Sequence, residues 1–286
     1  CAGIGVLQGT IITRIGLPSF VVTLAGLLFW QGVLLKILGQ GGTIPIQDDT
    51  INNIASANIS PLAGWILMLA LVAVFGLTLW RRDWKRRRAG LVAPPPAITL
   101  LKIGGALAGG VALVLLCNYD RGRLVPISGV PWVVLLVVGV LVVWTILLGR
   151  TTLGRYLYAI GGNAEAARRA GVNLARIRTI AFMLCSLTAG IAGVVYASRL
   201  RSISTSIDGG TLVLYAVAAA VIGGTSLFGG RGKAIHGVLG GIVIAAIDNG
   251  MGLLGFTAAS KYMVTALVLL AAVTIDALSR RSRVAT

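Results

Sequence analysis

Acidic side chains are scarce in this sequence: its 286 residues include eight Asp and Glu, against 25 Lys and Arg. Charged residues of both signs make up 12% of the chain, well below the ~25% of soluble domains, whereas hydrophobic residues make up 57%. So little charge cannot cover a water-exposed surface around one core, and so hydrophobic a composition excludes an intrinsically disordered chain. The composition therefore predicts a protein that crosses a membrane several times.

Histidine and cysteine are also rare. The single histidine, His236, excludes a metal site built from several histidines and leaves no convincing Ser-His-Asp or Cys-His arrangement for catalysis. The three cysteines, Cys1, Cys117 and Cys185, lie far apart in apolar surroundings, without the spacing of a metal site or a disulfide framework. We therefore expect neither a cofactor nor an enzymatic activity in this chain.

The net charge of +17 does not indicate binding to nucleic acid, because the basic residues occur in short clusters between apolar runs. If the chain crosses the membrane at each run, most of these residues fall on one side, with the richest clusters at 81–88 and 150–178. By the positive-inside rule this side is cytoplasmic, and the C-terminus lies there as well.

Several apolar runs match the ~20 residues that a helix needs to cross ~30 Å of hydrocarbon. The clearest are Ser19–Leu35, Ile59–Trp80, Ile98–Cys117, Val130–Leu148 and Thr179–Ser198. The chain begins inside a further apolar run, Cys1–Thr13, without a Met start or a signal peptide. We therefore expect an N-terminal truncation that removes one or more helices.

The C-terminal third is less regular. Leu212–Phe228 contains several glycines, Gly237–Thr257 contains Asp248, and Tyr262–Ile275 is short for a full crossing. Irregular backbone is tolerated at membrane depth only where protein or water covers it, so broken or half-length helices are expected here. The sequence thus predicts an all-α fold: a polytopic membrane helix bundle that forms a single transmembrane domain over residues 1–286.

Asp248 is the only acidic residue deep in an expected span. An ionisable residue inside the membrane usually serves a function. Asp248 and Asn249 either line a polar path for a solute, or lie near a helix end where a basic group or water satisfies the carboxylate. The sequence leaves both interpretations open.

Glycine is frequent, with 39 residues, and two pairs have the Gly-x-x-x-Gly spacing. These pairs are Gly105 with Gly109 and Gly237 with Gly241. Such pairs allow two membrane helices to approach closely, but at this glycine content they also arise by chance.

A basic run, RRDWKRRRAG, precedes Pro94-Pro95-Pro96. Three prolines cannot lie inside a helix. The run and the prolines together predict a cytoplasmic loop that re-enters the membrane, with its cations facing lipid headgroups.

The segment 150–177 is too polar to span the membrane, but it predicts a short helix on the cytoplasmic side. Asn163 is a good N-cap residue, Glu165 falls in the first turn, where it suits the helix dipole, and Gly171 stands at the C′ position. Two arginines occupy the last turn, and two glycines end the preceding segment. The pattern predicts a helix of about two turns with both ends specified.

So short a helix is marginal alone in water, and its four alanines form a small-residue surface. It suits insertion into a cleft on a partner, although a helix lying on lipid headgroups remains the alternative. The candidate docking residues are Gly161, Gly162, Asn163, Ala164, Glu165, Ala166, Ala167, Arg168, Arg169 and Gly171.

The residues YAIGGN at 158–163, AAR at 166–168 and Gly171 resemble the cytoplasmic coupling loop of permease subunits in bacterial ABC-type sugar importers, the group that serves ribose, xylose and galactose. Two more stretches resemble this family: RIGLPSFVVTLAGL at 14–27 and AAAVIGGTSLFGGRGKAIHGVLGGIVIAAIDNGMGLLG at 218–255. The basic run and the triple proline are most similar to the xylose-type permeases.

The resemblance implies a multi-pass protein of the bacterial inner membrane. Two permease copies, forming a homodimer, would enclose the pathway, cytoplasmic ABC ATPase subunits would bind the coupling helices, and a periplasmic or lipid-anchored sugar-binding protein would dock outside. ATP would bind to the partner, because GGRGKAI departs from the phosphate-binding loop G-x-x-x-x-G-K-[ST] at Leu227 and Ala234.

Two alternatives remain open at this point. One is a related importer permease for branched-chain amino acids or nucleosides. The other is an ion-coupled secondary transporter, which would need buried carboxylates on several helices, whereas only Asp248 qualifies.

Overall fold

The fold is taken from a computed structural model, which describes the chain except for residues 40–41, 91–94, 120–128, 206–208, 228 and 285–286, and except for the side chains of 275–286. The chain divides into two units. Unit 1 comprises Cys1–Gln47 and Val137–Thr286, and unit 2 comprises Asp48–Leu136.

Six helices of the described chain are long and apolar enough to cross a membrane. They are α2 (Ser19–Leu38), α4 (Pro61–Arg88), α5 (Pro96–Asn118), α6 (Trp132–Arg150), α9 (Leu174–Leu200) and α11 (Ala234–Leu253). Many of their apolar side chains are exposed, such as Phe20 at 71% and Leu101 at 76%. Such surfaces suit contact with lipid or a partner, so the prediction of a polytopic helical membrane protein is confirmed.

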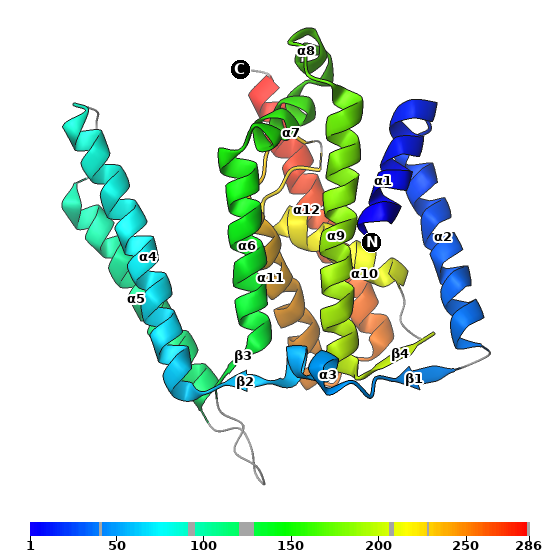
Figure 1. Cartoon of the computed structure of the whole chain (residues 1–286), viewed down its shortest axis with the longest axis horizontal. Coiled ribbons are helices and arrows are strands. Elements are labelled where there is room, and N and C mark those ends of the chain that lie inside the picture. Colours follow the sequence, from blue (N-terminus) through cyan, green and yellow to red (C-terminus); the bar gives the residue numbers. More distant parts are fainter. Residues whose placement is uncertain (40–41, 91–94, 120–128, 206–208, 228, 285–286) are drawn as a thin grey trace. The chain divides into compact units, whose positions relative to one another are not determined.

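Unit 2 is built on an antiparallel hairpin of α4 and α5 (Figure 1). Near the basic end of α4, Asp83 is only 4% exposed and accepts a hydrogen bond of 2.7 Å from Thr99 Oγ1 on α5. At the other end of the hairpin, the short α3 (Asp49–Ser56) and the strand β2 (Asn58–Ile59) precede α4. This strand pairs antiparallel with β3 (Val130–Pro131).

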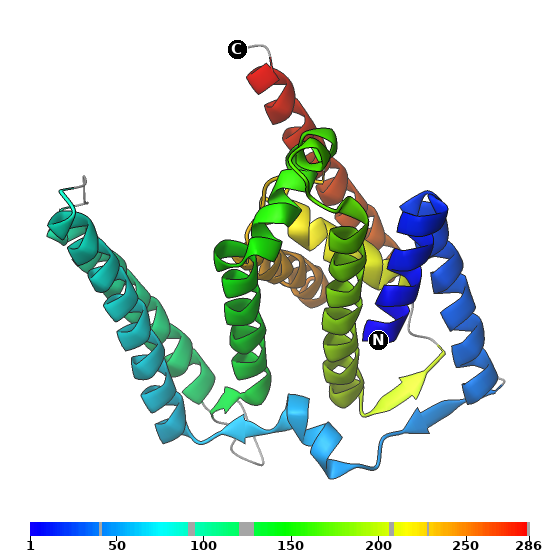
Figure 2. The same ribbon diagram turned by 45° about the horizontal axis from the view of Figure 1, so that its top comes forward.

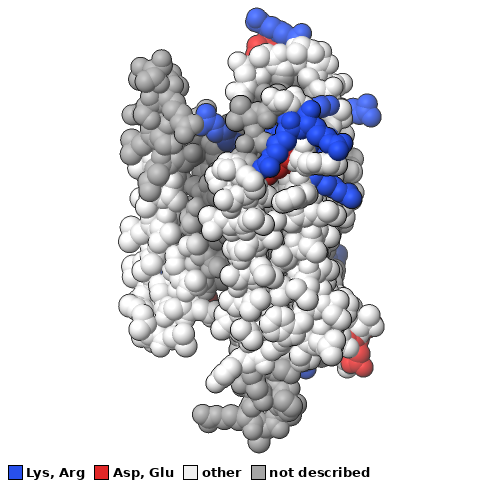
Figure 3. Space-filling view, turned by 90° about the vertical axis from the view of Figure 1, so that its left-hand side faces the viewer, with Lys and Arg blue, Asp and Glu red and all other residues white. Residues whose placement is uncertain are grey.

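The basic run does not form the expected loop, because α4 stays helical as far as Arg88. Lys and Arg are good helix formers, and cations are favourable at a helix C-terminus. Pro94 lies outside the described residues, whereas Pro95 and Pro96 stand at the start of a helix as expected, since α5 begins at Pro96 with Pro95 as its N-cap residue. On the face of this hairpin seen in Figure 3, Lys and Arg gather toward one end, and most of the remaining surface is uncharged.

In unit 1, the first helix packs along α9. It consists of α1 (Ala2–Thr10) and a π-helical turn, η1 (Ile11–Ile15). The two helices approach closely because Gly5 faces α9: a Cβ there would lie 2.5 Å from the carbonyl oxygen of Phe182. At the far end of α9, β4 (Ser202–Ser204) pairs antiparallel with β1 (Thr43–Pro45).

The C-terminal third contains a half-length helix, as expected. The helix α10 (Gly209–Ile222) has 14 residues. The segment 223–233 that follows is called here the α10–α11 connection, and its described residues, 223–227 and 229–233, are not helical. The run expected to be short for a full crossing lies in α12 (Ala258–Val284), a 27-residue helix that is not among the six long apolar helices of the described chain. The small core of this region is formed by Ala218, Ala219 and Ile244.

Neither Gly-x-x-x-Gly pair marks a helix contact within the described chain. A Cβ on Gly105, Gly109, Gly237 or Gly241 would have no neighbouring atom within 4 Å. The close contact of α11 with α10 lies one position away from the second pair, at Gly240, where a Cβ would collide with the backbone oxygen of Ala219.

Candidate coupling site

The polar segment 150–177 folds as two short helices between α6 and α9: α7 (Thr152–Gly162) and α8 (Ala164–Arg169). Both lie at the end of unit 1 opposite the β1–β4 pair (Figures 1 and 2). Sequence reasoning missed α7, although two signals were present. Thr151 caps the helix by accepting a 3.1 Å hydrogen bond from the Gly154 N–H. Apolar residues with helical spacing are half-buried, at Leu153, Leu157 and Ile160.

Both predicted ends of α8 are confirmed. The Asn163 side chain accepts a 3.0 Å hydrogen bond from the Ala166 N–H, which makes it the N-cap residue. Gly171 has a φ of +82°, and its N–H donates to the Arg168 carbonyl, while the Val172 N–H donates to the Ala167 carbonyl. This pair of bonds is a Schellman motif, which favours glycine at C′. The helix itself has six residues.

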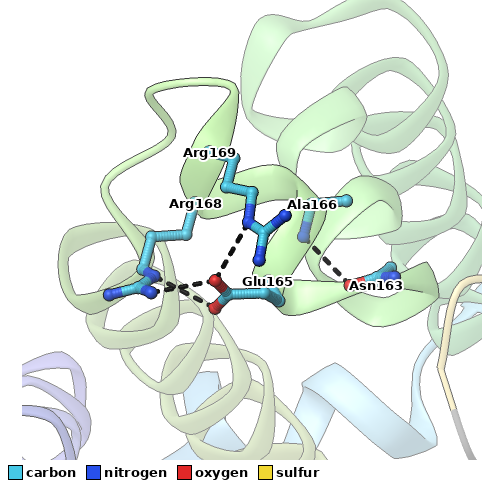
Figure 4. A network of polar contacts seen from close by, with 5 residues as sticks. All are labelled: Asn163, Glu165, Ala166, Arg168 and Arg169. Atoms are coloured by element: carbon cyan, nitrogen blue, oxygen red, sulfur yellow. Dashed lines mark hydrogen bonds and ion pairs between the residues drawn. The ribbon is translucent and has the colours of Figure 1, made fainter.

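The charges of α8 bind one another (Figure 4). Arg168 Nη2 lies 2.9 Å from Glu165 Oε1, and Arg169 Nε lies 3.2 Å from the same oxygen. All three side chains are at least half exposed, and exposed ion pairs contribute about 0–1 kcal/mol each. The two arginines of the last turn therefore form, with Glu165, a polar surface on one side of the helix.

The four alanines of this segment do not form one surface. Ala167 is 5% exposed and faces the body of unit 1, and Ala164 is half-buried. The surface available to a partner is therefore mixed, with Ala166 and Ala170 beside the charged residues. A partner that binds here must accommodate a Glu–Arg–Arg group as well as small side chains.

The α10–α11 connection lies directly against the end of α7. The Tyr158 hydroxyl donates a 2.7 Å hydrogen bond to the Gly232 carbonyl oxygen. A Cβ on Gly161 would collide with the backbone nitrogen of Gly230, whereas Gly162 faces open space. Sequence reasoning identified Gly161 and the later glycine-rich stretch separately and had no signal to join them.

Asp248 and Asn249 lie in the last two turns of α11, whereas the contact with α7 is made by the connection that precedes its first turn. Asp248 Oδ1 is 3.6 Å from Lys261 Nζ on α12, and the two side chains are 49% and 25% exposed. The structure therefore places a basic group beside the carboxylate, as one of the two sequence interpretations expected. A role of these two residues in a solute path stays a prediction.

The pKa of Glu165 lies below its usual value of 4.5, because Arg168 and, secondarily, Arg169 donate hydrogen bonds to the carboxylate. The ion pairs therefore stabilise α8 above pH 4.5 and are lost as the pH falls through the lowered pKa.

We expect an NMR titration of the Glu165 carboxyl carbon to give a midpoint below 4.5. Arg168→Gln should move this midpoint upward, whereas Arg176→Gln on α9 should leave it unchanged. Equal midpoints for the wild type, Arg168→Gln and Arg176→Gln would contradict the ion pair between Glu165 and Arg168.

Comparison with known proteins gives a family match over nearly the whole chain. The model of a family described as "Branched-chain amino acid transport system / permease component" matches residues 1–273. The xylose transport system permease protein XylH of Escherichia coli is 36% identical over 281 residues, which cover 97% of this chain and 68% of that protein. XylH of Haemophilus influenzae is 35% identical over 280 residues, covering 97% and 72%.

A ribose protein matches a shorter part of the chain. The ribose import permease protein RbsC of Escherichia coli is 41% identical over 130 residues, which cover 46% of this chain and 40% of that protein. No solved structure matches the chain.

Proposed function

Because this chain belongs to the branched-chain amino acid transport system / permease component family, we propose that it is the transmembrane subunit of an ATP-driven importer for a monosaccharide, with a pentose such as xylose favoured. It is a multi-pass protein of the bacterial cytoplasmic membrane. The observation that carries the sugar assignment is the similarity to XylH over 97% of this chain, which includes α7, α8 and the α10–α11 connection.

In this proposal, α8 is the coupling helix that a cytoplasmic ABC ATPase grips, and the ATPase alone hydrolyses ATP. Three features support this role for α8: both its ends are capped, its exposed surface combines charged and small side chains, and it projects between α7 and α9 (Figure 1). A sugar-binding protein would dock at the opposite end of unit 1, near the β1–β4 pair. Residues 1–286 would act as one transmembrane domain, with 150–177 as its coupling loop.

A second copy of the chain would complete the pathway as a homodimer. The open positions on α11 support this part of the proposal, because Gly237 and Gly241 lie one turn apart with no atom of the described chain against them. Small residues at this spacing allow a helix of another subunit to approach closely. Asp248 and Asn249 are the candidate pathway residues on the same helix.

The ion-coupled alternative is less well supported. A proton or sodium relay needs carboxylates on several spans. In the described spanning helices, Asp83 lies 3.2 Å from Arg82 and Asp248 lies 3.6 Å from Lys261, so each acidic side chain already has a cationic neighbour.

Reconstitution in proteoliposomes tests the proposal. With the cognate ATPase and binding protein present, we expect ATP-dependent, vanadate-sensitive uptake of radiolabelled xylose, and native mass spectrometry should find two permease copies in each complex. Uptake driven by an ion gradient without the ATPase would reject the importer, and uptake of leucine in place of any sugar would favour the amino acid permease. In the same assay, wild-type uptake by Asp248→Asn would show that the pathway does not need this charge.

A further inference from the structure

Two glycine pairs, far apart in the sequence, meet at the end of α7. One is Gly161 with Gly162, and the other is Gly229 with Gly230 in the α10–α11 connection. A Cβ on Gly229 would lie 2.8 Å from the Gly161 oxygen, and one on Gly230 would lie 3.0 Å from the Gly162 Cα. The two backbones are therefore in direct contact, with no side chain between them.

Hydrogen bonds join the described residues of the α10–α11 connection, 223–227 and 229–233, to one another. Within it, the Ser226 N–H donates to the Arg231 carbonyl at 3.1 Å, and the Gly229 N–H donates to the Ser226 carbonyl at 3.2 Å. The Thr225 N–H also donates to the Ala220 carbonyl of α10 at 2.9 Å, which ties the connection to that helix. Its other end runs into α11 at Ala234.

The other partner in the contact, α7, is tied equally closely to α8. Asn163 is both the C-cap residue of α7 and the N-cap residue of α8, so no flexible linker separates the two helices. The Tyr158 hydroxyl adds the 2.7 Å hydrogen bond to the Gly232 carbonyl. Closely packed groups resist compression, so a displacement of α8 that carries α7 with it must push or pull the connection.

We propose that this contact, formed by Gly161 and Tyr158 with the glycines of the α10–α11 connection, transmits the motion of α8 to α10 and α11. The inference rests on the proposed function, in which an ATPase moves α8. Gly161 and Tyr158 act as positioning residues: neither touches the solute or ATP. The contact gives the coupling helix a route to α11, the helix that carries Asp248, besides its covalent continuation into α9.

Glycines near the ends of α6 and α7 offer a matched pair of variants. Gly161→Ala places a methyl group against Gly230, whereas Gly149→Ala, in α6 and outside the candidate docking residues, places one in open space, and both changes favour the helix by the same propensity. In the reconstituted complex, we expect Gly161→Ala to lower the sugar taken up per ATP hydrolysed by about tenfold, within the 5–150-fold range typical of coupling between sites. Copurification of the ATPase should be unchanged, because the new methyl group faces the connection. Tyr158→Phe should lower the same ratio several-fold, and Gly149→Ala should match the wild type.

Equal uptake per ATP for Gly161→Ala and Gly149→Ala, in a complex whose wild type transports, would overturn the transmission role. Failure of the proposed function would look different, because the wild type itself would then show no ATPase-dependent uptake.

A distance measurement tests the same inference without disturbing the contact. Spin labels at Arg155→Cys on α7 and Arg231→Cys in the connection, both exposed positions, report whether the two segments move together. With the native cysteines replaced, we expect the distance between labels to stay within about 2 Å between the nucleotide-free and vanadate-trapped complexes. A larger change would show that α7 moves away from the connection and would reject the proposal.

Discussion

Replacing Ala167 with proline is expected to detach the ATPase and reduce sugar uptake to background. The Ala167 N–H donates a 3.0 Å hydrogen bond to the Asn163 carbonyl, and the residue is 5% exposed. Proline removes this bond and its ring clashes with the preceding turn, which costs about 3 kcal/mol or more in a helix interior. A helix of six residues has no further turns to compensate for the loss. The measurements are copurification of the ATPase and uptake by the reconstituted complex.

Ala164→Pro is the matched control. Ala164 is the first residue of α8, where proline is well tolerated, because its missing N–H has no partner within the helix. The preceding Asn163 has φ −154° and ψ 102°, an extended conformation that also suits a residue before proline. We expect this variant to bind the ATPase as the wild type does. A coupling role for α8 would be refuted if Ala167→Pro retained the ATPase at the same yield, with both variants monodisperse in detergent.

Gly240→Ala should cause the largest loss of stability among single methyl additions to α11. The new Cβ would collide with the backbone oxygen of Ala219, and a backbone atom cannot rotate away as a side chain can. The two helices must then separate around their core of Ala218, Ala219 and Ile244. Overpacking of this kind costs about 1–3 kcal/mol, so we expect a lower thermal unfolding midpoint in detergent and loss of transport.

The neighbouring glycine provides the comparison for this variant. A Cβ on Gly241 meets no atom of the described chain within 4 Å, so Gly241→Ala should unfold at or above the wild-type temperature. Equal midpoints for the two variants would mean that α10 and α11 are not in contact at Gly240. Gly241 belongs to the proposed homodimer surface. The thermal unfolding midpoints of both variants are therefore measured on the separated subunit, where this surface has no partner.

Local interactions explain why α8 could be predicted in detail. Its N-cap, its acidic first turn and its C′ glycine all lie within nine residues of one another, and each acts on the nearest backbone groups. The membrane spans were predictable for a similar reason, since the length and hydropathy of a run decide whether it can cross. These features need no knowledge of the rest of the chain.

The sequence did not predict which side of each helix packs against its neighbour. An apolar span such as α11 is hydrophobic all round, so the sequence carries no stripe that says which face packs inward. The Gly-x-x-x-Gly spacing therefore drew attention to Gly237 and Gly241, while the contact with α10 lies at Gly240. In the same way, four alanines of the α8 segment looked equivalent, and only packing against the body of unit 1 buried Ala167.

The sequence by itself determined a helical membrane protein with a short, doubly capped helix on its basic side, because composition and capping act over a few residues. Tertiary structure alone decided that Gly161 meets Gly230 and that Asp248 meets Lys261. Such pairs join segments distant in the chain. Their identity depends on the rotation and register of whole helices, which close packing fixes and local sequence does not.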